Sequence, residues 1–114
     1  MFDFLKKVRV DQEKVHEFCD WFVDNEEKIR RSIECMRDDP NGLQSMLDEV
    51  ELQLARVYRD GYRGKIEFEY GGKDEDWELH LFHLNNKFLI RATGLIAEEL
   101  NPRLAGRWVT RTER

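Results

Sequence analysis

The sequence has little of what marks secreted or membrane proteins. It contains only two cysteines among 114 residues, and no apolar run approaches the roughly 18 residues of a membrane span. Cys19 and Cys35 would lie on one predicted helix, about 24 Å apart at 1.5 Å per residue, which is too far for a disulfide. Residues 1–10 lack the apolar segment and cleavage site of a secretory signal. We therefore expect a cytoplasmic protein that does not enter a membrane.

The sequence also lacks the motifs of common enzymes. Its two serines, Ser32 and Ser45, lie outside any G-x-S-x-G motif. Gly71-Gly72 lacks the helix and the Lys-Ser/Thr pair that follow a phosphate-binding loop. Acidic residues are so numerous that a pair of carboxylates carries little information. We expect no catalytic residues and no cofactor.

Metal-binding patterns are equally scarce. His16 and Cys19 are three residues apart on a predicted helix, but nothing else in the sequence completes the four ligands of a zinc site. His80 and His83 would point to opposite faces of a strand. The acidic residues 74–76 lack the alternating spacing of a calcium loop. We therefore expect no metal site.

Charge, by contrast, is abundant and unevenly placed. Charged residues make up 38% of the chain, and the net charge is -5. Residues 1–60 carry that whole excess of acid, whereas residues 61–114 are balanced. Four arginines but only one acid fall in the last 13 residues: Arg103, Arg107, Arg111 and Arg114. This basic tail either neutralises the acidic helices within the fold or leaves them free to bind a basic partner. An acidic body repels phosphates, so we do not expect nucleic acid binding.

The strongest periodic pattern runs from residue 11 to residue 36. Apolar side chains recur there at helical spacing, with Asp11 suited to cap the start, and they form one stripe: Val15, Phe18, Phe22, Ile29, Ile33 and Met36. Asn25 falls inside the stripe and Glu26 at its edge, beside Trp21. A buried amide must find partners. We call Trp21, Asn25 and Glu26 the polar notch; Asn25 either bonds a neighbouring backbone group or helps to bind a ligand.

Further elements follow from spacing and turn residues. A second helix is predicted from about residue 41, with a capping box of Asn41 and Gln44, to about residue 58. Alternation predicts strands at 65–70 and 77–84, joined by a hairpin loop at 71–76.

The ends of the chain are less clearly patterned. Residues 87–93 fit either a third strand after an Asn-Asn turn or the start of a helix that Pro102 ends, and the helix is favoured. Residues 107–112 predict a last strand. Residues 1–10 could be a short strand, a helical turn or a lead-in segment.

These elements predict one α+β domain spanning residues 1–114. The order is α-α-β-β-α-β, with a long antiparallel helical hairpin packed on one face of a small, mainly antiparallel sheet.

One segment resembles a known group of proteins. The run from Trp21 to Ile29 reads W-F-x-x-N-E-x-x-I and is similar to the N-terminal helix of a group of small bacterial proteins with no established activity. An acidic second helix, a hairpin, a third helix ending near a proline and a strand beginning with tryptophan follow in that group. The matching proline and tryptophan here are Pro102 and Trp108. The resemblance implies the fold and no activity.

Three functional hypotheses follow. The first is a non-catalytic interaction module whose acidic helical face binds a basic protein surface; an immunity-type inhibitor of a toxin is one concrete form. The alternative is a small-molecule-binding protein or small enzyme that uses the polar notch. The third is self-association through apolar residues that the sheet does not cover: Phe82, Leu84 and Ile90.

Overall fold

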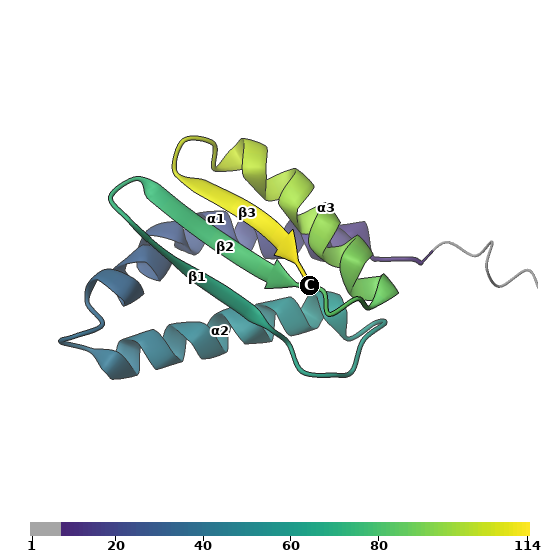
Figure 1. Ribbon diagram of the computed structural model, residues 1–114, viewed down its shortest axis with the longest axis horizontal. Helices are drawn as coiled ribbons and strands as arrows, with labels where there is room; N and C mark the ends of the chain where they lie inside the picture. The colour runs from purple at the N-terminus through teal and green to yellow at the C-terminus, as the bar shows by residue number, and fades with distance from the viewer. Residues whose placement is uncertain (1–7) are drawn as a thin grey trace, which may run out of the picture.

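The computed structural model describes residues 8–114, and Figure 1 shows the arrangement of its elements. Three helices and three strands follow one another in the predicted order, so the α+β fold class is confirmed. The predicted lead-in segment lies largely outside the described residues, and residues 8–10 belong to no helix or strand.

The first helix, α1, spans Gln12–Glu34 and begins where the sequence predicts. The Asp11 carboxylate accepts hydrogen bonds from the backbone amides of Glu13 and Lys14, as an N-cap should. The helix ends two residues earlier than predicted, because the chain turns after Cys35 towards Pro40. Met36 therefore lies beyond the helix and is 46% exposed, so its placement in the buried stripe was wrong.

The second helix, α2, spans Pro40–Tyr58 and forms an antiparallel pair with α1. Its N-cap is Asp39, whose carboxylate accepts a 2.9 Å hydrogen bond from the Gly42 amide. The predicted capping box of Asn41 and Gln44 was wrong. Pro40 fits the first helical position because no helical partner exists for an amide there.

The first two strands form a hairpin that is tighter than predicted. Strand β1 spans Phe68–Lys73 and pairs antiparallel with β2, Asp76–Phe82. The loop predicted at 71–76 was too long, because the ladder continues through both of its glycines as far as Lys73, opposite Asp76. Asp74 accommodates the short turn with a positive φ of 59°.

The third helix, α3, spans Lys87–Arg103, so residues 87–93 are helical. The Asn86 side chain caps it by accepting a hydrogen bond from the Leu89 amide. The expectation that Pro102 ends the helix was wrong by one residue. The Leu104 amide still bonds the Leu100 carbonyl and completes the last turn around the proline.

The last strand, β3, spans Trp108–Glu113 and lies parallel to β2, with Trp108 opposite Trp77. The strand order is β1-β2-β3, which makes the sheet mixed, with one antiparallel and one parallel pair. Buried side chains of all three helices and all three strands belong to one hydrophobic cluster. Residues facing the helices, such as Leu79, are buried, whereas Glu78 on the other face is exposed. Among the described helices, none is long and apolar enough to cross a bilayer.

Candidate functional site

The polar residue buried on α1 is Glu26 rather than Asn25. Glu26 lies between Phe22 and Ile29 on the core-facing side of the helix and is only 2% exposed. Its carboxylate accepts a 2.9 Å hydrogen bond from the Trp108 indole N–H. It also bonds Arg30 Nε at 2.8 Å and Arg107 Nη2 at 2.7 Å. We call these four residues (Glu26, Arg30, Arg107 and Trp108) the Glu26 cluster.

The Glu26 cluster holds its carboxylate in the charged form. Burial by itself raises the pKa of Glu26, but the hydrogen bonds from Arg30 and Trp108 and the charge of Arg107 outweigh it. The pKa of Glu26 therefore lies below its ordinary value. With its oxygens engaged by three donors, the carboxylate ties α1 to the start of β3.

The other two residues of the polar notch lie apart from this carboxylate. The Asn25 amide nitrogen donates a 2.8 Å hydrogen bond to the Trp21 backbone carbonyl, one turn earlier in the helix. A shallow surface depression touches Asn25, Glu27 and Lys28 but neither Trp21 nor Glu26. None of the cavities described within residues 8–114 is lined by all three side chains of the polar notch. A ligand at the notch stays a prediction.

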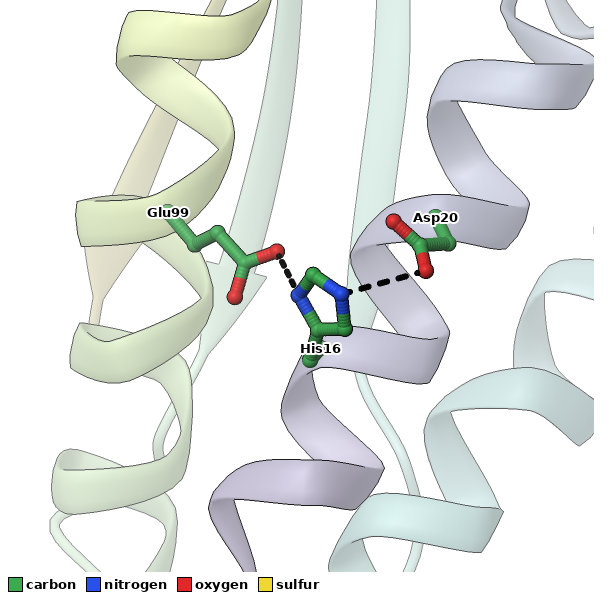
Figure 2. A group of neighbouring side chains, drawn as sticks. All are labelled: His16, Asp20 and Glu99. Carbon is green, nitrogen blue, oxygen red and sulfur yellow. Dashed lines mark hydrogen bonds and ion pairs between the residues drawn. The ribbon is translucent and has the colours of Figure 1, made fainter.

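A second polar cluster lies where α1 meets α3. Figure 2 shows the His16 ring between two carboxylates, with Nδ1 2.8 Å from Glu99 and Nε2 3.3 Å from Asp20. We call His16, Asp20 and Glu99 the histidine cluster. No spacing rule connects His16 with Glu99, which lies 83 residues away, whereas the i,i+4 spacing of His16 and Asp20 is typical of neighbouring side chains on one helix.

The histidine cluster is the one group of described residues whose donor atoms are close enough to hold a metal ion. Arg103 already offsets one of its two negative charges, however. The guanidinium lies 2.8 Å from Asp20 and 2.8 Å from Glu99. A divalent cation would have to bind beside that positive charge, so the arrangement serves better as an ionic contact between two helices than as a metal site.

The two cysteines occupy different environments. Cys19, on the α3 side of α1, is buried, and burial raises the pKa of its thiol to about 12. Cys35 is exposed near the end of α1 and lines a cavity of about 450 Å³ between α1 and α2. Lys28, Arg31, Asp39 and Glu49 also line that cavity, and no hydrogen bond joins the Cys35 thiol to any of these side chains.

The acidic residues of α2 form an exposed group. Asp48, Glu49 and Glu51 are all exposed, and Leu52 beside them is 56% exposed. We call these four residues the acidic face. Within residues 8–114, none of its carboxylates has an ion-pair partner (Asp48 accepts only a hydrogen bond from neutral Gln44).

The apolar residues considered for self-association are only partly available. Leu84 is 43% exposed and Ile90 is 48% exposed, whereas Phe82 is half-buried on the outer face of the sheet.

No family model, curated protein or solved structure matches this chain. The resemblance of the Trp21–Ile29 segment to a group of small bacterial proteins therefore stays a prediction.

Proposed function

We propose that this chain is a non-catalytic interaction module whose acidic face on α2 binds a basic surface of another protein. The observation that carries the proposal is that the three carboxylates of this face have no ion-pair partner among residues 8–114. From Pro40 to Tyr58 the helix contains three acids and one basic residue, Arg56, which lies one turn after Leu52. The exposed Leu52 beside the three carboxylates gives a partner one apolar contact next to negative charge.

The contrast with α1 supports this choice of face. Arg103 of the basic tail pairs with Asp20, and Arg107 pairs with Glu26. Glu27 has its own partner one turn later, Arg31. The tail therefore neutralises two acids of α1, whereas the three carboxylates of the acidic face have no ion-pair partner among the described residues. A bacterial cytoplasmic setting, and neutralisation of a basic toxin by an immunity-type protein, are the more specific form of the proposal.

The test compares two variants of equal charge. In the first, the acidic face is neutralised by Asp48→Asn, Glu49→Gln and Glu51→Gln. In the matched control, three other exposed helical acids are neutralised by Glu13→Gln, Glu17→Gln and Asp24→Asn. A partner is first captured from host lysate on the wild-type protein, and its association rate is then measured with all three proteins across ionic strength.

The acidic-face variant should slow association by about tenfold at low salt, and the difference should shrink at high salt as the charges are screened. The control should associate nearly as fast as wild type. Equal rates for the two variants, or a wild-type rate that is insensitive to salt, would show that the acidic face does not guide binding.

A further inference from the structure

The two edges of the sheet differ in whether their outward-pointing backbone groups have hydrogen-bond partners. In β3, the backbone groups of even-numbered residues point away from β2. The Thr110 amide donates a 2.7 Å hydrogen bond to the Asn101 side chain, whose nitrogen donates to the Thr110 carbonyl at 3.1 Å. The Trp108 amide bonds the Leu104 carbonyl. Helix α3 and the turn after it therefore occupy this edge (Figure 1).

The free edge of β1 has no such protection. The Phe82 amide bonds the Glu67 carbonyl, so alternate residues from Glu67 onward bond to β2. The backbone groups of Phe68, Tyr70 and Gly72 consequently point away from the sheet. Within residues 8–114 these groups have no hydrogen-bond partner, and β1 is the outer strand.

The strand itself is regular enough to accept another strand. Its six residues pair with β2 in an unbroken register, and they include no proline and no bulge, which commonly protect sheet edges. Gly71 and Gly72 add no side chains beyond Cα. An edge of this kind is a template for strand addition.

We propose that two copies of this chain associate through the free edges of β1, antiparallel, with Tyr70 opposite Tyr70 of the second copy. This register places Phe68 opposite Gly72 of the other copy. It therefore joins the three residues whose backbone groups are free, and each such pair exchanges two hydrogen bonds. The contact is isologous, as a twofold dimer requires, and it joins the two three-stranded sheets into one.

The charges on the outer face fit this register, and each neighbouring register is disfavoured for its own reason. Lys73 lies opposite Glu67 of the second copy, and Glu69 lies opposite Gly71. A shift of two residues in one direction would bring Glu69 opposite Glu69 and Lys65 opposite Lys73. The opposite shift would pair Glu69 with Lys73, but it would place Phe68 against Asp74, which has a positive φ and lies in the turn rather than in the strand.

Gly71 offers a matched pair of variants. A Cβ atom at this position would meet no atom within 4 Å, so the monomer has room for a side chain there, and Glu78 of β2 lies opposite it in monomer and dimer alike. In the proposed dimer, Gly71→Glu brings a second carboxylate opposite Glu69 in two symmetric places, whereas Gly71→Lys brings an opposite charge there. Gly71→Glu should raise the dimer dissociation constant by about tenfold, and Gly71→Lys should lower it.

Sedimentation velocity over a wide concentration range measures the dissociation constants, and circular dichroism verifies that both variants are folded. Amide hydrogen exchange then locates the contact. The amides of Phe68, Tyr70 and Gly72 should become protected as concentration rises, whereas those of Glu69 and Gly71, already bonded to β2, should be protected throughout.

A wild-type chain that stays monomeric at the highest soluble concentration would overturn the proposal. So would a dimer whose concentration-dependent protection falls elsewhere, for example around Ile90 on α3. Equal effects of the two Gly71 variants on association would likewise exclude the proposed register. The inference does not depend on the function proposed for the acidic face, because the two use different elements.

Discussion

Removal of the Glu26 side chain is the sharpest test of how this fold is held together. In Glu26→Ala, the buried Trp108 indole N–H loses its acceptor, and a hydrogen bond to a charged group contributes about 1.5–3 kcal/mol. The two arginine partners are 23% and 55% exposed, so they can turn to water and each adds about 1 kcal/mol or less. We expect Glu26→Ala to lower the free energy of unfolding by about 3–4 kcal/mol.

Glu26→Gln separates shape from charge. The glutamine oxygen can still accept from Trp108, but the attraction to the two arginines is lost, so the cost should be about half that of the alanine variant. Urea unfolding followed by circular dichroism measures both values at pH 7. A double-mutant cycle with Trp108→Phe then isolates the bond itself, with an expected coupling of about 1.5 kcal/mol or more.

The pH dependence of the same variants gives an independent readout. Because the folded-state pKa of Glu26 is lowered, ionised Glu26 stabilises the fold fully above its unfolded pKa of about 4.3. That stabilisation is lost as the pH falls through the lower folded-state pKa. Wild type should thus lose its advantage over Glu26→Gln in acid. A loss below about 1 kcal/mol in Glu26→Ala, or no coupling to Trp108, would refute this account.

Three further predictions follow from the structure. Asn101→Ala should lower the free energy of unfolding, measured in urea, by about 1–2 kcal/mol. It should also speed amide exchange at Thr110, because the variant removes the side chain that bonds the Thr110 backbone groups; unchanged exchange at Thr110 would show that Asn101 does not protect this edge. Iodoacetamide in native buffer should alkylate Cys35 and spare Cys19 until the chain unfolds, as judged by mass spectrometry of the peptides. Excess Zn²⁺ should leave the melting temperature of the native chain unchanged but raise it in Arg103→Ala, where the histidine cluster has lost its positive neighbour. A zinc-dependent shift in the native chain would show that Arg103 does not block the site.

Local chemistry explains which elements could be predicted. Asp11 and the apolar spacing after it specify the start of α1, because a cap and a buried stripe are both short-range features. The same kind of signal does not decide where strand pairing ends. The Gly71-Gly72 pair is typical of a turn, yet both residues belong to β1 because pairing with β2 outweighs their low strand propensity.

The polar notch shows what helical spacing alone cannot predict, which is the polar residue that tertiary packing buries. The predicted stripe is centred too near Asn25, because helical spacing within α1 does not include the packing of α3 and β3 against one side of the helix. That packing turns the buried face towards Cys19 and Glu26. The partner of the buried carboxylate, Trp108, lies 82 residues away, and no spacing rule in a single sequence connects the two.

The uneven distribution of charge along the sequence can be interpreted only once the ion pairs between distant residues are known. Two interpretations of the basic tail were open: neutralisation within the fold, or an acidic surface left for a partner. The structure bears out neutralisation on α1, where Arg103 pairs with Asp20 and Arg107 with Glu26. The carboxylates of the acidic face have no ion-pair partner among the described residues, although Arg56 lies one turn after Leu52, and binding of a basic partner stays a proposal. The formal charge of -5 is therefore not spread evenly over the helical hairpin. The acidic face carries part of the hairpin charge that has no ion-pair partner among the described residues. It is the surface that we propose attracts a basic partner from a distance.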